Sequence, residues 1–122
     1  MKSVFIAGSR RFYNEIKNLA NDLNKNKVMT STAGEYNSSK KDTLTSEKRA
    51  LLSAFDKIRK SDLLYVYSKK GYIGKTVAME IAFAYCLKKE IIAYDIIEEF
   101  SAQALVSKVL KPKELMEYCR KN

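Results

Sequence analysis

Residues 63–94 read LLYVYSKKGYIGKTVAMEIAFAYCLKKEIIAY, and this stretch decides the fold class. It opens on a short apolar run, 63–67, which is typical of a buried strand. A loop marked by glycines follows, then the apolar helical run 76–87, and Ile91–Tyr94 predicts the next strand. A strand, a helix and a further strand in this order predict a right-handed crossover between parallel strands.

The apolar helical run contains one acidic residue, Glu80. Every other side chain from Thr76 to Leu87 is apolar or carries a small or aromatic hydroxyl or a thiol. A carboxylate is costly to keep ionised there unless another group uses or compensates it. The upstream glycines, Gly71 and Gly74, permit a sharp turn that exposes backbone N–H groups where the helix begins. Glu80 is therefore the main functional candidate, and the alternative is an acid that compensates the helix N-terminus or pairs with an arginine.

Strands and helices are predicted to alternate on either side of this unit. Val4–Ala7 predicts the first buried strand, and apolar residues at helical spacing predict a helix over 12–23 that stops around 24–26. Residues 28–29 predict a brief second strand. Residues 30–45 are polar and without period, and predict a loop that acts as a lid or a disordered tip.

Two further helices are predicted beyond this loop and one near the end of the chain. Ser46 is expected to cap the helix whose buried face carries Leu51, Leu52, Phe55 and Ile58. Residues 101–110 predict another helix, and Pro112 is well placed to open a last short one.

This alternation predicts an α/β fold: a three-layer sandwich with a parallel four- to five-stranded sheet, flavodoxin-like or Rossmann-like. The first and third strands are expected to be neighbours, with the chain leaving them toward opposite faces. Ligands of such sheets bind beside the carboxyl ends of the strands at that switch point. The loops at 8–11 and 68–75 should meet there, and their cations would favour phosphate: Arg10, Arg11, Lys69, Lys70 and Lys75. Of these, the two arginines are the expected contacts, whereas Lys69 and Lys70 are expected to point into solvent.

Composition narrows the class of protein and of chemistry. With 122 residues and 46% hydrophobic content, we expect one domain, 1–122, with one core. The chain contains no histidine, which excludes catalytic triads, Cys-His pairs and HExxH zinc sites. A net charge of +9 favours anionic partners, although most lysines are expected to serve solubility alone.

The sequence also carries expectations about location. Its apolar stretches are shorter than the roughly 20 residues that a membrane span needs. The run after Met1 is too brief for a signal peptide. Cys86 and Cys119 have no metal-ligand spacing and are expected to be buried thiols. We therefore expect a cytoplasmic protein with no membrane partner, no metal site and no cofactor.

Three blocks of sequence together resemble the nucleoside 2-deoxyribosyltransferase superfamily. They are VFIAGSRR at 4–11, SDLLYVYSKKGYIG at 61–74 and TVAMEIAFAYCLKKEIIAY at 76–94. The GYIG loop followed by T-x-x-x-E-I-x-x-A resembles small bacterial deoxyribosyltransferase-like proteins. The GSRR turn is similar to the phosphate loop of 2′-deoxynucleoside 5′-phosphate N-hydrolases. The resemblance covers roughly Val4 to Tyr94 and is weak between Lys27 and Arg49.

The resemblance implies a nucleoside or nucleotide ligand and cleavage or transfer at its N-glycosidic bond. By position, Glu80 would be the nucleophile that attacks the anomeric carbon, kept ionised by the helix dipole. Tyr72, between two loop glycines, could stack on a base. The expected substrate-binding residues are Gly8, Ser9, Arg10, Arg11, Gly71, Tyr72, Gly74, Lys75 and Thr76.

Three positions depart from the family pattern. Ala54 stands where the family often has an aspartate, Phe5 where the hydrolases have a tyrosine, and Gly74 where the transferases have an aspartate. Asp56, Asp62 and Tyr72 are the candidates for the missing acid, and no spacing argument selects among them.

The alternative to an enzyme is a catalytically inactive nucleotide-binding or sensing module of the same fold. A nucleic-acid-binding domain is favoured by net charge alone, so nucleic acid is not the expected partner. Tyr65, Tyr67 and Tyr94 are expected to serve strand packing. Because the helix over 76–87 is apolar nearly all round, its outer side is expected to form a homo-oligomer interface, a dimer or higher.

Overall fold

The structure is a computed structural model that describes residues 1–34 and 42–122. Its central strands are β1 (Val4–Ala7), β3 (Leu63–Val66) and β4 (Glu90–Ala93), each within one residue of the range expected from sequence. The edge strands are β2 (Thr30–Thr32) and β5 (Lys108–Val109). The helices are α1 (Tyr13–Lys25), α2 (Leu44–Lys60), α3 (Lys75–Cys86), α4 (Phe100–Gln103) and α5 (Pro112–Lys121), with short 3-10 turns η1 (Arg10–Phe12) and η2 (Lys69–Gly71).

The strands form one parallel sheet in the order β2-β1-β3-β4-β5. This order is that of flavodoxin-like doubly wound folds. Phe5 lies opposite Leu64, and Leu64 lies opposite Ile91. The predicted α/β sandwich with a parallel sheet is confirmed, and so is the pairing of the first strand with the third.

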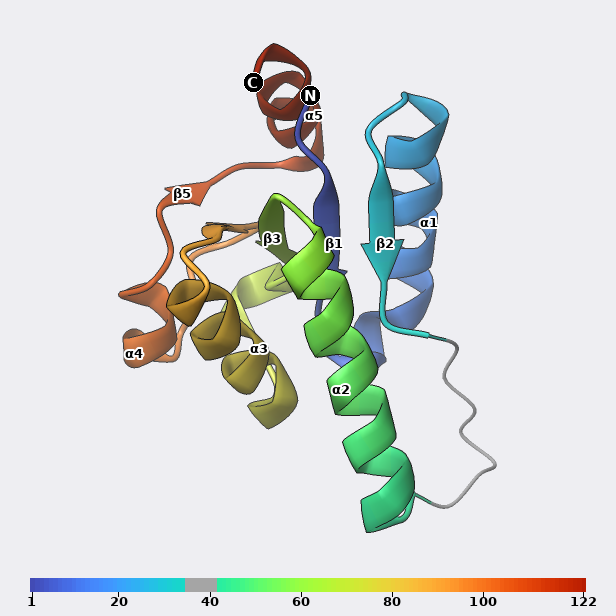
Figure 1. The fold of residues 1–122 in the computed structure, drawn as a ribbon. Helices are drawn as coiled ribbons and strands as arrows, with labels where there is room; N and C mark the ends of the chain where they lie inside the picture. The colour runs from blue at the N-terminus through green and yellow to red at the C-terminus, as the bar shows by residue number, and fades with distance from the viewer. Residues whose placement is uncertain (35–41) are drawn as a thin grey trace.

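Two apolar cores lie on opposite faces of the sheet, because successive strand residues point to opposite sides. Val4 and Ile6 belong to the core beneath α1 and α5, whereas Phe5 and Ala7 belong to the core beneath α2, α3 and α4. Figure 1 shows these helices around the central strands. The helices thus form the two outer layers of the sandwich.

Helix α2 differs from its prediction in both its cap and its buried face. Thr43, not Ser46, is the N-cap: its hydroxyl accepts from the Ser46 N–H at 3.0 Å, and the Ser46 hydroxyl accepts from the Thr43 N–H at 2.9 Å. Ala54 is buried, although it was not part of the predicted face. Of the predicted face, Ile58 is buried and Phe55 packs against the core, whereas Leu52 is 54% exposed. Figure 1 shows the reason, since the first half of α2 extends beyond the sheet.

The two edge strands also correct the sequence predictions. The second strand begins at Thr30 instead of residue 28. Residues 35–41 of the predicted lid lie outside the described part of the chain. The helix predicted over 101–110 is wrong beyond Gln103. Lys108 instead pairs with Ile92 as part of β5, because an open sheet edge offers backbone hydrogen bonds that outweigh local helical preference.

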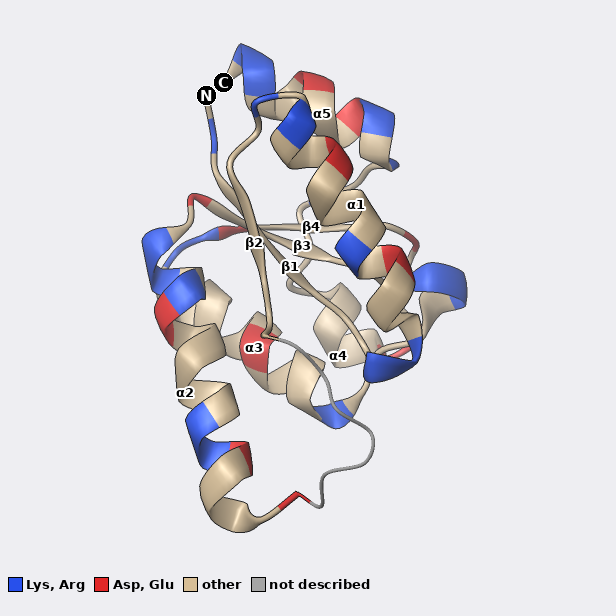
Figure 2. Cartoon of the chain, turned by 90° about the vertical axis from the view of Figure 1, so that its right-hand side faces the viewer, with Lys and Arg blue, Asp and Glu red and all other residues tan. Residues whose placement is uncertain are grey.

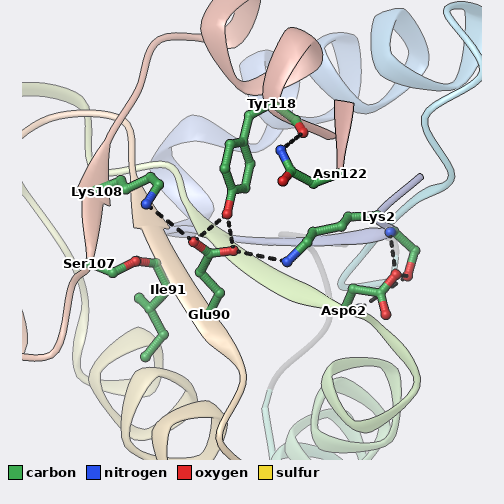
Figure 3. Close-up of polar contacts among 9 residues, drawn as sticks. Lys2, Asp62, Glu90, Ile91, Ser107, Lys108, Tyr118 and Asn122 are labelled. Carbon is green, nitrogen blue, oxygen red and sulfur yellow. Dashed lines mark hydrogen bonds and ion pairs between the residues drawn. The ribbon is translucent and has the colours of Figure 1, made fainter. Parts of the chain in front are cut away.

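Helix α5, which Pro112 opens as predicted, is fixed to the amino end of the sheet through Glu90 (Figure 3). The Tyr118 hydroxyl lies 2.8 and 2.7 Å from the two Glu90 carboxylate oxygens, and Lys2 and Lys108 pair with the same carboxylate at 3.4 and 3.7 Å. The Lys2 N–H donates to the Cys119 carbonyl at 3.0 Å, so the two ends of the described chain lie together.

The two cysteines have different surroundings. Cys119 is buried as predicted, but Cys86 is exposed, because it lies at the outer end of α3. Within residues 1–34 and 42–122, no helix combines the length and apolar character that a membrane crossing requires.

Candidate functional site

A pocket of about 980 Å³ opens at the carboxyl end of β1. It lies between α1, α2 and the start of α3, and Glu80 forms part of its wall. The chain leaves β1 toward the α1 face and leaves β3 toward the α3 face. The pocket therefore occupies the switch point of the sheet, where doubly wound folds bind ligands.

Glu80 is buried, with 6% of its surface exposed. Its carboxylate makes no hydrogen bond or ion pair to any residue of the described ranges. Burial raises its pKa to about 7. Burial thus opposes the helix dipole, which is expected to keep this carboxylate ionised, and favours the protonated form more than in an exposed glutamate.

The loop after β1 forms one wall of the pocket through Gly8, Ser9 and Arg10. Position 8 requires a glycine because neighbouring side chains pack against its Cα. A Cβ there would lie 2.6 Å from Ile16 Cδ1 and 3.2 Å from Tyr67 Cβ. The Ser9 hydroxyl caps η1 by accepting from the Arg11 N–H at 3.3 Å. The tight turn thus directs Arg10 along the pocket.

The start of α3 forms another wall through Gly74, Lys75 and Thr76. Gly74 is the N-cap, and no side chain of the described residues caps this end of the helix. Glu80 follows two turns later on the same helix. The structure thus brings seven of the ten predicted site residues to one pocket: Gly8, Ser9, Arg10, Gly74, Lys75, Thr76 and Glu80.

The other three predicted residues lie outside the pocket lining. The Arg11 guanidinium stacks on the Tyr72 ring at 3.8 Å from its centroid, and Tyr72 also contacts Phe12 edge-on at 6.4 Å. Gly71 is buried with a φ of 83°, and its carbonyl accepts from the Glu98 N–H at 2.9 Å. Arg11 and Tyr72 thus connect the loop after β1 to the β3–α3 loop, and neither they nor Gly71 line the pocket.

The two remaining loop cations do not reach the pocket either. Lys69 pairs with Glu15 at 3.0 Å. Lys70 is exposed, and its backbone N–H donates to Asp95 at 2.8 Å. Of the five cations in the two loops, Arg10 and Lys75 line the pocket.

One face of α2 lines the pocket, although no role was predicted for it from the sequence. Two acidic side chains at the start of α2 form ion pairs with Arg10. Asp42, just before the N-cap, lies 2.8 Å from the guanidinium, and Glu47, in the first turn, lies 3.3 Å from it. The bond to Asp42 is the main reason that the pKa of Arg10 is raised. Lys57 donates to the Thr32 carbonyl at 2.9 Å. The helical spacing of the small and polar residues at 46, 50, 53 and 57 was the signal that could have revealed this face.

The pocket wall is more basic than acidic. Among the described residues, its lining contains five cations and three acids: Arg10, Lys17, Arg49, Lys57 and Lys75 against Asp42, Glu47 and Glu80. Figure 2 shows blue segments along α2 and red at the single acidic residue of α3. No cluster of three metal-ligating side chains is present within the described ranges. Charge therefore suits an anionic ligand better than a cation.

None of the candidate second acids lies in the pocket. Ala54 does line it, at the position where an aspartate was expected. Asp56 pairs with Lys60 at 2.9 Å on the exposed side of α2. Asp62 accepts from the Ser3 N–H at 2.7 Å at the amino end of β3, and this bond lowers its pKa.

The three strand tyrosines pack as expected. The Tyr65 hydroxyl donates to the Leu110 carbonyl at 2.7 Å, and the Tyr67 hydroxyl donates to Glu15 at 2.8 Å. The Tyr67 and Tyr94 rings contact each other with centroids 4.8 Å apart. They lie in or against the core beneath α1 and α5.

The fold and pocket define a flavodoxin-like α/β protein with a switch-point site. Among solved structures, a conserved protein from Enterococcus faecalis V583 is similar, with a TM-score of 0.66 and 16% sequence identity. The similarity covers 99% of this chain and 98% of that one, and at this identity it shows the fold alone. No protein-family model matches the chain, and no curated protein matches it.

Proposed function

We propose that the protein cleaves or transfers at the N-glycosidic bond of a (deoxy)nucleoside or nucleoside 5′-monophosphate, with Glu80 as the nucleophile. The observation that carries this proposal is the position of Glu80. Its carboxylate is buried in a basic switch-point pocket and has no partner among the described residues. A ligand that donates a hydrogen bond to this carboxylate would lower its pKa and favour the reactive form.

The reaction would proceed in two displacements. A Glu80 oxygen forms a bond to C1′ of the sugar while the C1′–N bond breaks, and the electron pair of that bond leaves with the base. The base takes a proton from water in the open pocket, because the position of the expected acid is Ala54. Water or a second base then attacks C1′ and releases Glu80, as in retaining glycosidases.

The test measures release of free base from deoxynucleosides and their 5′-monophosphates by chromatography. The isosteric substitution Glu80→Gln removes the nucleophile, so we expect base release to fall by more than about 1,000-fold while the fold is kept. Asp56→Asn is the matched control, because it removes one negative charge from an exposed site outside the pocket. Its activity should stay within about twofold of the unmodified protein. Equal activity of the Glu80→Gln variant would overturn the role of Glu80.

A second candidate function is nucleotide binding without cleavage, favoured by Ala54 in the pocket wall. It predicts that nucleoside monophosphates raise the melting temperature of the protein with no release of base. Base release that depends on Glu80 would exclude this alternative. Absence of both stabilisation and base release across the common nucleotides would exclude both candidates.

A further inference from the structure

Arg10 connects two walls of the pocket. Its Nη1 lies 2.8 Å from an Asp42 oxygen, and its Nη2 lies 3.3 Å from a Glu47 oxygen. Arg10 belongs to the loop after β1, Asp42 directly precedes the cap of α2, and Glu47 lies in the first turn of that helix. All three side chains line the pocket.

We infer that this contact is autoinhibitory: Asp42 and Glu47 occupy Arg10 until an anionic group of the ligand enters the pocket and takes the guanidinium from them. The inference rests on the anionic ligand of the proposed function but not on its chemistry. It gives the two carboxylates a role that an anion-binding pocket would otherwise not explain.

The chemistry of the guanidinium supports an exchange. Its N–H groups form a rigid fork that suits a phosphate as well as a carboxylate, and an N–H that faces Asp42 or Glu47 is not available to a ligand. The three side chains keep 48, 58 and 41% of their surface exposed. Exposed ion pairs are weak, so a phosphate supported by the other pocket cations can replace them.

The exchange would also act on α2. Besides Arg10, the start of this helix is held by the capping box between Thr43 and Ser46, and its first residue, Leu44, is 92% exposed. Loss of two ion pairs therefore loosens the first turn, where few buried contacts compensate. Binding of an anion is thereby coupled to the mobility of one pocket wall.

The experiment titrates the protein with inorganic phosphate at constant pH and ionic strength, followed by amide NMR. Asp42→Asn and Glu47→Gln each remove one competitor and should raise the affinity for phosphate about two- to fivefold, which corresponds to a typical exposed ion pair. Asp56→Asn is the matched control, because it removes the same charge from α2 without a contact to Arg10. It should change the affinity by less than about 1.5-fold.

The same three substitutions in an Arg10→Gln background complete a double-mutant cycle. If the carboxylates act through Arg10, the gain from Asp42→Asn and Glu47→Gln disappears there. Arg10→Lys repeats the cycle with the charge kept. In the unmodified protein, phosphate should also speed hydrogen exchange of the amides at 44–48, and the Arg10→Gln variant should not show this change.

Three results would overturn the inference: a gain that persists without Arg10, an equal gain from Asp56→Asn, or no gain from either pocket substitution. The first two would show that overall charge alone governs affinity. Phosphate contains no glycosidic bond, so these results do not depend on base release. Conversely, a failed assay of base release would leave the exchange at Arg10 intact.

Discussion

At the scale of single residues, Glu80 combines burial with a charge that the surrounding apolar atoms do not favour. Its pKa of about 7 lies well above the value of 4.5 of an unperturbed glutamate. The folded state therefore binds the proton more tightly than the unfolded chain. A functional side chain often has this property, because a site arranged for a ligand is not arranged for stability.

This shift predicts that Glu80 makes the protein less stable as the pH rises from about 4.5 to about 7. Below this window Glu80 is protonated in both the folded and the unfolded protein. Within it only the unfolded chain releases the proton, and above it the folded protein carries the full free-energy cost of a buried carboxylate. At about 1.4 kcal/mol per pH unit, the penalty amounts to about 3 kcal/mol.

Glu80→Gln should therefore raise the free energy of unfolding at pH 8 by up to about 3 kcal/mol, with little effect near pH 4.5. Urea denaturation of both proteins at several pH values measures the difference. Parallel stability curves across this range would contradict the raised pKa.

At the scale of elements, the loop between β3 and α3 contains two glycines, of which only one is needed for its backbone conformation and its close packing. Gly71 has a φ of 83°, and a Cβ there would lie 2.8 Å from Glu98 Cγ and 2.9 Å from the Ile96 carbonyl oxygen. Gly74 has ordinary dihedral angles, and apart from its chain neighbours no atom of the described residues lies within 4 Å of the position of its Cβ. Sequence alone treats these two glycines alike.

Gly71→Ala should lower the free energy of unfolding by at least about 2 kcal/mol, because it adds a left-handed residue and a clash. Gly74→Ala should change it by less than about 0.5 kcal/mol, since the loss of an N-cap glycine and the stiffer unfolded chain oppose each other. Thermal or urea denaturation of the two variants measures the contrast. Equal destabilisation would show that the loop does not hold Gly71 as described.

The pattern of apolar residues predicted the central elements but not the edges of the fold. Val4–Ala7 and Leu63–Val66 are apolar throughout because helices cover both faces of the sheet, and such runs are visible in sequence. The buried face of α2 was predicted only in part: Ile58 is buried, but Leu52 is 54% exposed, and the first half of this helix extends beyond the sheet. Burial there depends on where the neighbouring layer ends.

At the scale of the whole molecule, Glu90 connects the last helix to the sheet. It lies at the start of β4 and contacts both Tyr118 of α5 and Lys2, which precedes β1. Tyr118 supplies two hydrogen-bond contacts to this carboxylate, and lysines from both ends of the chain surround it (Figure 3). The side chain of Glu90 is 19% exposed, which strengthens these contacts relative to a surface pair.

Tyr118→Phe should lower the free energy of unfolding by about 1.5–3 kcal/mol, the range for a hydrogen bond to a charged group. Tyr85→Phe is the matched control, because the Tyr85 hydroxyl has no hydrogen bond to a described residue and the side chain is 56% exposed. It should change stability by less than about 0.5 kcal/mol. Equal effects of the two substitutions, measured by urea denaturation, would show that Glu90 does not anchor α5.

Hydrophobic period and glycine placement are local signals, and they were sufficient to predict the parallel α/β sandwich, the pairing of β1 with β3, and Glu80 as the unusual acid. Which loop residues reach the pocket depends instead on how the folded elements pack. This packing turned Arg11 and Tyr72 toward each other and brought Arg10 to Asp42 and Glu47. Such choices depend on distances between segments more than 30 residues apart in the chain, which no local pattern encodes.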